Sequence, residues 1–90
     1  MNDMIGQTVL VTGSTSGIGR AVAIRLAESG AAVALHGRNA DAAEQVAEEI
    51  RRSTGSVAGV FLTDIATSDG CDELIADVIK TCPTLHAACL

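Results

Sequence analysis

The sequence is almost without aromatic residues. Its 90 residues include no tryptophan, no tyrosine and a single phenylalanine, Phe61. The core must therefore consist mainly of Ala, Val, Ile and Leu, which favours close packing of helices on a sheet over a wide cavity. At this length we expect one small domain.

Paired cysteines, targeting signals and excess positive charge are also missing. The three cysteines, Cys71, Cys82 and Cys89, are odd in number and lack C-x-x-C spacing, which favours free thiols in a reducing compartment. The opening MNDMIGQ lacks the features of a signal peptide, and no apolar run approaches the ~18 residues of a membrane span. A net charge of −5 disfavours nucleic acid but is compatible with one small phosphorylated ligand. We therefore expect a cytoplasmic protein without a membrane or nucleic-acid partner.

Short apolar runs alternate with segments of helical periodicity. Residues 7–12, 31–36 and 56–64 have the composition of strands that are buried on both faces of a sheet. Residues 17–29 and 68–80 have helical periodicity between and after these strands. Another helix, the second in chain order, is predicted within residues 39–55. The order βαβαβα predicts an α/β fold with a parallel sheet and right-handed crossovers.

Particular residues indicate where these helices begin and end, and which of their faces is buried in the core. Gly30 is expected to end the first helix, Asn39 to cap the second and Gly55 to stop it. The apolar positions of the first helix are Ile18, Val22 and Leu26. Those of the third helix are Cys71, Leu74, Ile75, Val78 and Ile79.

The last ten residues, TCPTLHAACL, break this regularity. Their only candidate strand is LHAACL, which is short and consists mostly of Ala and Cys. Cys82, His86 and Cys89 supply three soft metal ligands within a short span. A fourth ligand and a finger-like context are missing, so a zinc site is not expected.

A glycine-rich stretch joins the first predicted strand to the first predicted helix. Its glycines, Gly13, Gly17 and Gly19, have the spacing G-x-x-x-G-x-G. Gly13 allows a tight turn, Gly17 allows the backbone to approach a pyrophosphate, and Gly19 allows close packing of the helix on the strand. The helix N-terminus presents free N–H groups to an anion, and Ser14, Thr15 and Ser16 add hydroxyl donors. The alternative is a strand-to-helix turn without a ligand.

The same stretch resembles the cofactor signature T-G-x-x-x-G-x-G of the short-chain dehydrogenase/reductase family at every fixed position. LHGRN at residues 35–39 and TDI at residues 63–65 extend the resemblance, which covers residues 7–80. It implies a Rossmann-type parallel sheet with flanking helices, of which residues 1–90 are the first half, a partial NAD(P)-binding domain with an atypical segment at 81–90. It also implies that Asp64 accepts a hydrogen bond from adenine and that Ile65 packs on the ring edge. From its residue type alone, Asp64 is equally suited to cap a turn.

The end of the second predicted strand bears on the choice of nicotinamide cofactor. An Asp or Glu there usually binds the ribose 2′-hydroxyl of NAD, but this segment reads His36, Gly37, Arg38, Asn39. A guanidinium binds a 2′-phosphate with two parallel hydrogen bonds, so Arg38 favours NADP over NAD. The alternative for Arg38 is a solvated loop arginine. The predicted cofactor-binding residues are Gly13, Ser14, Thr15, Ser16, Gly17, Ile18, Gly19, Arg38, Asp64 and Ile65.

The residues that carry out the family's chemistry are missing from the sequence. The resemblance implies NADP-dependent hydride transfer to or from a carbonyl or alcohol, with a Tyr as proton donor in a Y-x-x-x-K motif. This chain has no tyrosine, and its only lysine is Lys80. We therefore predict no catalytic residue and expect the chain to be inactive alone, as the N-terminal part of a truncated or frameshifted oxidoreductase. The alternatives are a non-catalytic nucleotide-binding module and a non-functional fragment with an exposed sheet edge. A homo-oligomer remains open, although the helices that usually form the family's interface are absent.

Overall fold

The computed structural model describes residues 5–15, 17–63, 68–82 and 85–89. For Ser68 and residues 87–89 the description is restricted to the backbone. The four strands found there are β1 (Thr8–Val11), β2 (Ala32–Gly37), β3 (Ser56–Leu62) and β4 (Ala87–Cys89). They form one parallel sheet in the order β3-β2-β1-β4. The three helices are α1 (Gly17–Glu28), α2 (Ala40–Arg51) and α3 (Ser68–Thr81).

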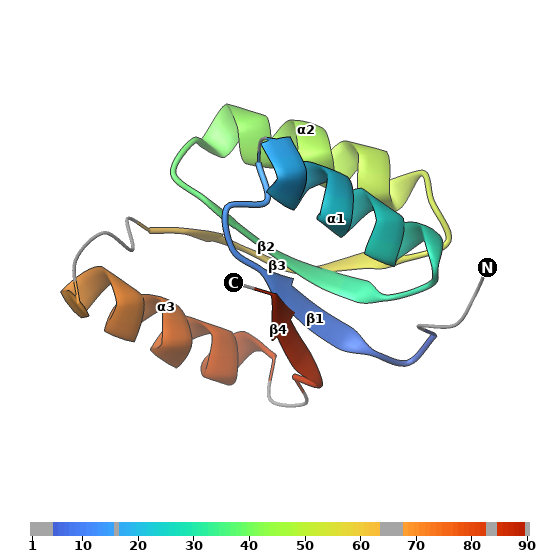
Figure 1. Cartoon of the computed structure of the whole chain (residues 1–90). Coiled ribbons are helices and arrows are strands. Elements are labelled where there is room, and N and C mark those ends of the chain that lie inside the picture. Colours follow the sequence, from blue (N-terminus) through green and yellow to red (C-terminus); the bar gives the residue numbers. More distant parts are fainter. Residues whose placement is uncertain (1–4, 16, 64–67, 83–84, 90) are drawn as a thin grey trace.

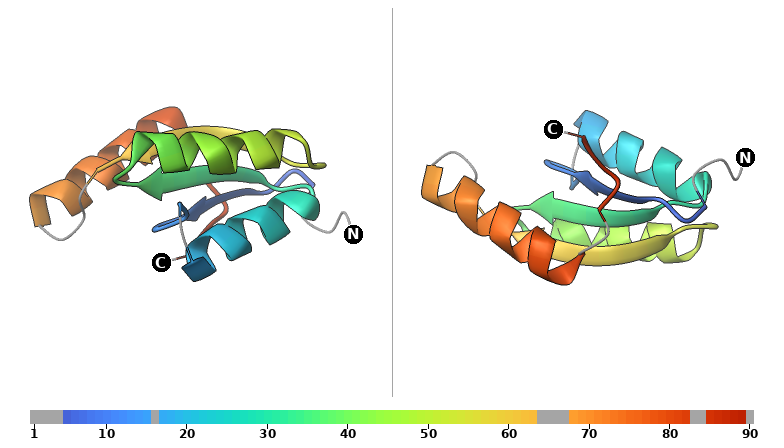
Figure 2. Two further views of the ribbon diagram at one scale, coloured as in Figure 1. Left: turned by 90° about the horizontal axis from the view of Figure 1, so that it is seen from above. Right: turned by 90° about the horizontal axis from the view of Figure 1, so that it is seen from below.

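The helices cover both faces of this sheet. Figure 1 shows α1 and α2 on one face and α3 on the other. The view from below in Figure 2 shows α3 lying along β3. The predicted βαβαβα order is therefore confirmed, with one short strand added after it.

Local hydrogen bonds mark the end of α1 and the start of α2, at residues that the sequence predicts. Gly30 has a φ of 98°, and its N–H donates to the carbonyl of Ala27 at 2.9 Å. The N–H of Ala31 donates to the carbonyl of Leu26 at 3.1 Å, which completes a Schellman motif. Asn39 caps α2, since its side chain accepts from the N–H of Ala42 at 3.1 Å. The predicted stop of α1 and cap of α2 are thus confirmed.

Gly55 has a different role from the one predicted. The helix α2 ends at Arg51, and its C-cap is Arg52, so Gly55 is not the stop. A Cβ at Gly55 would lie 2.4 Å from the carbonyl oxygen of Ala31 and 2.6 Å from that of Ala27. Glycine therefore allows the connection between α2 and β3 to pass close to the end of α1.

The core between the sheet and α1 and α2 is aliphatic. Ala23 and Ala27 are fully buried and place α1 close to the strands, while Val22 and Leu26 are only partly buried. Ile18, predicted to share this apolar face, is 84% exposed. Small side chains therefore form the buried face of α1, as the shortage of aromatic residues led us to expect. Other members of this core are Val9, Val11, Val33, Leu35, Val46, Ala47 and Ile50.

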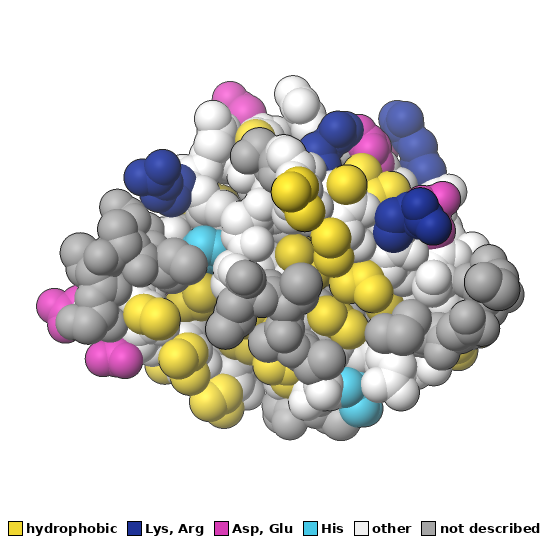
Figure 3. Space-filling view, viewed as in Figure 1, with side chains coloured by type: hydrophobic (Ala, Val, Ile, Leu, Met, Phe, Trp, Pro, Cys, Tyr) yellow, Lys and Arg dark blue, Asp and Glu magenta, His cyan; other side chains and the backbone are white. Residues whose placement is uncertain are grey.

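The buried stripe of α3 is narrower than predicted. Leu74, Val78 and Cys82 are buried against Leu10, Ala34 and Phe61 on the second face of the sheet. Ile75 and Ile79, predicted for the same face, are 52% and 63% exposed, and Cys71, also predicted for it, is exposed as well. The space-filling view in Figure 3 shows hydrophobic side chains at the surface over α3 and over α1.

The segment that broke the sequence pattern adds a strand to the sheet. Backbone pairing joins Val9 to Ala87 and Val11 to Cys89, on the side of β1 away from β2. His86 secures the start of this pairing, because its N–H donates to the carbonyl of Thr8 and its Nδ1 accepts from the N–H of Thr8, both at 2.9 Å. β1 is therefore an interior strand of the described sheet, and β4 and β3 are its edges.

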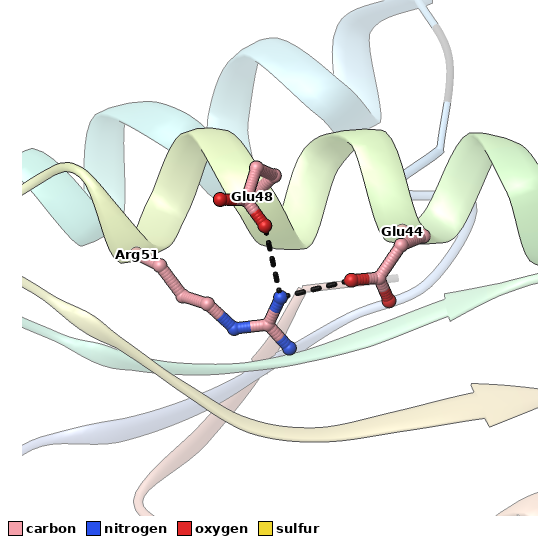
Figure 4. A network of polar contacts seen from close by, with 3 residues as sticks. All are labelled: Glu44, Glu48 and Arg51. Carbon is pink, nitrogen blue, oxygen red and sulfur yellow. Dashed lines mark hydrogen bonds and ion pairs between the residues drawn. The ribbon is translucent and has the colours of Figure 1, made fainter.

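Ion pairs lie on the outer surface of α1 and α2. Arg51 contacts Glu44 at 2.9 Å and Glu48 at 3.4 Å on α2, as Figure 4 shows. Arg20 of α1 pairs with Glu49 of α2. All these side chains are at least two-fifths exposed, so the pairs contribute little to stability.

Candidate functional site

The candidate site lies where β1, β2 and β3 end. Because the strands are parallel, the segments that follow Val11, Gly37 and Leu62 emerge at the same edge of the sheet. This carboxyl edge is where open α/β sheets bind ligands. The glycine-rich loop, Arg38 and Thr63 are therefore brought to one edge although they are far apart in sequence.

Two glycines give the loop between β1 and α1 its shape. Gly13 and Gly17 have φ values of 61° and 58°, a backbone conformation that other residues rarely adopt. Among the described residues, no atom apart from the adjoining backbone lies within 4 Å of the position that a Cβ would take at either residue. The loop is thus turned as a phosphate cradle requires, with open space beside it.

The third glycine brings α1 onto this loop. A Cβ at Gly19 would lie 2.1 Å from the carbonyl oxygen of Gly13. Only glycine permits this approach, which places the first turn of α1 directly behind the loop. The unpaired N–H groups of that turn and the positive end of the helix dipole are a general means of binding an anion.

Ser14 joins the loop to the end of β2. Its side chain is fully buried, and its hydroxyl donates to the carbonyl of His36 at 3.1 Å and accepts from the N–H of His36 at 2.8 Å. The N–H of Ser14 also donates to the carbonyl of His36 at 2.9 Å. This hydroxyl was predicted to face a phosphate or ribose, but in the structure it is engaged inside the fold.

Thr15 and Gly37 form a second contact between the loop and β2. A Cβ at Gly37 would lie 2.4 Å from the Cγ2 atom of Thr15. Glycine at the end of β2 therefore lets the loop lie against the strand.

The other predicted residues have different surroundings. Arg38 is exposed directly after β2, and Ile18 is exposed in the first turn of α1. Ser16, Asp64 and Ile65 lie outside the described residues. Thr63, immediately before Asp64, has a buried Oγ1 atom without a hydrogen-bond partner in the described part of the chain.

His36 lies at this edge as a buried residue at the end of β2 whose ring nitrogens are both hydrogen-bonded, as its place at a strand end indicated. Its side chain is 3% exposed, and its ring lies between the segments that follow β1 and β3. Nδ1 accepts from the N–H of Gly13 at 3.1 Å, and Nε2 lies 2.9 Å from the carbonyl oxygen of Thr63.

The described residues do not form a metal site or a membrane span. No group of three or more metal-ligating side chains occurs within the described ranges. His86, one of the three soft ligands noted in the sequence, uses Nδ1 to accept from Thr8. Among the described residues, the helices are too short or too polar to cross a membrane.

The parallel sheet, its two helical layers and the glycine-rich first turn define the class of this protein, a Rossmann-type α/β fold. A family model described as short chain dehydrogenase matches residues 7–88. The chain belongs to this family.

Relatives and solved structures agree with this assignment. The chain is 46% identical over 70 residues to the uncharacterized oxidoreductase YvaG of Bacillus subtilis, covering 77% of this chain and 26% of YvaG. It is 43% identical over 75 residues to a glucose 1-dehydrogenase of Gluconobacter oxydans, covering 83% of this chain and 28% of the relative.

Among solved structures, the citronellol catabolism dehydrogenase AtuB of Pseudomonas aeruginosa superposes with a TM-score of 0.87 at 39% identity, over 97% of this chain and 36% of AtuB. A Shigella flexneri protein described as a short chain dehydrogenase complexed with NADP has a TM-score of 0.84 at 35% identity, over 97% of this chain and 37% of that protein. The chain therefore spans between about a quarter and two-fifths of the length of these relatives.

Proposed function

We propose that this chain binds the adenosine and pyrophosphate part of NADP(H), with NADP preferred to NAD. The observation that carries this proposal is the loop at Gly13 and Gly17, with its positive φ angles and open space, at the N-terminus of α1. Family membership supports it, since members of this family bind a nicotinamide dinucleotide. The NADP complex of the Shigella flexneri relative is consistent with the preference for NADP.

The residues at the carboxyl edge fit such a ligand. In this proposal the loop at Gly13, Thr15 and Gly17 surrounds the pyrophosphate, together with Ser16 and the N–H groups of the first turn of α1. Ser14 contributes through its place in the loop, because its hydroxyl is engaged with His36. Gly19 contributes to the proposed cofactor site by bringing α1 close to the loop. Ile18 contributes through its exposed position in the first turn of α1.

The remaining proposed contacts concern the adenosine. Arg38, exposed at the end of β2, is proposed to bind the 2′-phosphate, and no carboxylate lies between His36 and Ala40 to repel it. Asp64 and Ile65 are proposed to contact adenine. The buried Oγ1 of Thr63, which has no hydrogen-bond partner among the described residues, is a further polar group at this end of the site.

We propose that the whole protein is an NADP-dependent oxidoreductase that acts on a carbonyl or an alcohol. When bound, NADPH supplies the hydride for such a reaction. The 90 residues contain no tyrosine, so the family's Tyr proton donor is not among them. This chain alone is therefore expected to bind cofactor without reducing a carbonyl. The same absence favours a second candidate for the chain by itself, a nucleotide-binding module without catalysis.

Partners and location follow from composition. The free thiols of Cys71 and Cys82 support a reducing compartment such as the cytoplasm. A net charge of −5 supports a small ligand over nucleic acid. A homo-oligomer remains open in this proposal.

The test is a titration of the chain with NADPH and with NADH by calorimetry. We expect Arg38→Ala to weaken NADPH binding about tenfold or more, because a charge-assisted contact contributes about 1–3 kcal/mol. NADH binding should change little. Arg52→Ala is the matched control, since Arg52 is an exposed arginine at the opposite end of α2. The absence of any NADPH binding by the unmodified chain would contradict the proposal, and equal losses for NADPH and NADH would contradict the role of Arg38.

A further inference from the structure

His36 connects the three strand ends that make up the candidate site. The strand β2 lies between β1 and β3, so a side chain at its carboxyl end can reach the segments that follow both neighbours. The ring of His36 reaches Gly13 on one side and Thr63 on the other, at 3.1 Å and 2.9 Å. Gly13 opens the glycine-rich loop, and Thr63 precedes the two residues proposed to contact adenine.

The partners of the ring determine its chemical form. The N–H of Gly13 can only donate, so Nδ1 must offer its lone pair and carries no proton. The carbonyl of Thr63 can only accept, so Nε2 carries the proton and donates it. In this arrangement Nδ1 accepts and Nε2 donates, so the ring satisfies one backbone group on each side.

The contact with Gly13 bears directly on the shape of the cradle. Gly13 has a φ of 61°, and its N–H donates to Nδ1 of the His36 ring at 3.1 Å. The backbone of His36 holds the next residue, since its carbonyl accepts from the N–H and the hydroxyl of Ser14 at 2.9 Å and 3.1 Å. One residue of β2 thus fixes two consecutive residues of the loop.

We propose that His36 is a positioning residue of the nucleotide site, which sets the conformation of the glycine-rich loop through Nδ1. This inference rests on the proposed function and adds to it a residue that does not touch the ligand. Loss of the Nδ1 contact leaves the N–H of Gly13 without its acceptor inside the fold. The turn at Gly13 then loses the restraint that holds it in the binding conformation, and affinity falls although the residues around the ligand are intact.

Two substitutions distinguish the role of Nδ1 from the role of Nε2. The Oδ1 atom of His36→Asn occupies nearly the position of Nδ1 and can accept from Gly13, but the side chain is too short to reach Thr63. The terminal amide of His36→Gln reaches the position of Nε2 and can donate to Thr63, but it offers no acceptor at the δ position. Each variant keeps one of the two hydrogen bonds, so a purely structural role predicts similar losses of stability and of affinity for both.

The experiment is a titration of the full chain and both variants with NADPH, alongside thermal unfolding and amide hydrogen exchange without ligand. We expect His36→Gln to bind about tenfold more weakly, and His36→Asn to remain within about threefold of the unmodified chain, because the part-buried hydrogen bond that restrains Gly13 is lost in the first variant and kept in the second. The amide of Gly13 should exchange faster in His36→Gln than in His36→Asn. Equal affinities in the two variants, or losses that follow the unfolding temperature, would overturn the inference.

The two proposals fail in distinguishable ways. If the unmodified chain does not bind NADPH, the proposed function fails, and the exchange of the Gly13 amide alone then decides whether His36 sets the loop. If the unmodified chain binds and both variants bind equally well, the proposed function stands and the positioning role is rejected.

Discussion

Replacing Gly19 by alanine tests the close approach of α1 to the glycine-rich loop. The added Cβ would lie 2.1 Å from the carbonyl oxygen of Gly13, 2.8 Å from its carbonyl carbon and 3.3 Å from the Cα atom of Ser14. All three atoms belong to the backbone, so no side chain can rotate away. The first contact must lengthen to at least 3.0 Å, which requires the loop or the helix to move.

The expected magnitude is the difference between two opposing effects. In a helix without such a contact, Gly→Ala stabilises by about 1 kcal/mol. Displacing packed backbone costs about 3 kcal/mol, the upper end of the range for overpacking, because the moved segment is tied to His36. We therefore expect Gly19→Ala to lower the free energy of unfolding by about 2 kcal/mol. A domain of this length has roughly 5–13 kcal/mol in total, so the variant should still fold.

Urea denaturation followed by circular dichroism measures this difference. With a slope of about 1 kcal/mol per M, the midpoint should fall by about 2 M. Ala21→Gly is the matched control, because Ala21 is an exposed residue of the same helix and reports helix propensity alone, about 1 kcal/mol. If Gly19→Ala is as stable as the unmodified chain or more stable, the close approach described here is incorrect.

Three further changes test other parts of the fold. Asn39→Ala removes the acceptor for the N–H of Ala42 and should cost about 1 kcal/mol by urea denaturation, whereas an unchanged midpoint would rule out this cap. Phe61→Ala empties the largest side chain from the core beneath α3 and should cost about 3–5 kcal/mol by thermal unfolding, and a loss under 1 kcal/mol would show that this core is not closely packed. Burial raises the pKa of the Cys82 thiol because it disfavours the thiolate. Stability should therefore be fully retained below about pH 8.5, where unfolded thiols begin to ionise, and should fall as the pH rises further. Cys82→Ala should weaken this alkaline loss, and an unaltered pH dependence would contradict it.

Local patterns predicted most of the secondary structure. The end of α1 at Gly30 and the start of α2 at Asn39 depend on side chains and backbone angles within a few residues, so the sequence was sufficient to find them. Gly55 was misassigned because its requirement comes from Ala27 and Ala31, which are distant in sequence. The exposure of Ile18, Ile75 and Ile79 was missed because periodicity identifies a helical face but not how much of that face the sheet covers.

Some residues of the site could be predicted and others could not, because local patterns are visible in the sequence and contacts between distant residues are not. The glycines at positions 13, 17 and 19 were found because their spacing reflects backbone requirements within one short loop. The inward hydroxyl of Ser14 was not, because it depends on the lateral distance between β1 and β2. His36 could be placed at a strand end from the sequence, but its partners Gly13 and Thr63 depend on the order of the strands. Residues 64 and 65 lie outside the described ranges, so their proposed contacts with adenine stay predictions.

By itself, the sequence determined the alternation of strands and helices, the glycine-rich turn and the family. These depend on short-range periodicity, turn geometry and fixed spacing, all of which are written along the chain. Only the tertiary structure decided that residues 87–89 pair with β1 and that His36 joins Gly13 to Thr63. Both depend on which segments become neighbours in the sheet, and hydrogen bonds between residues more than twenty positions apart form only once that arrangement exists.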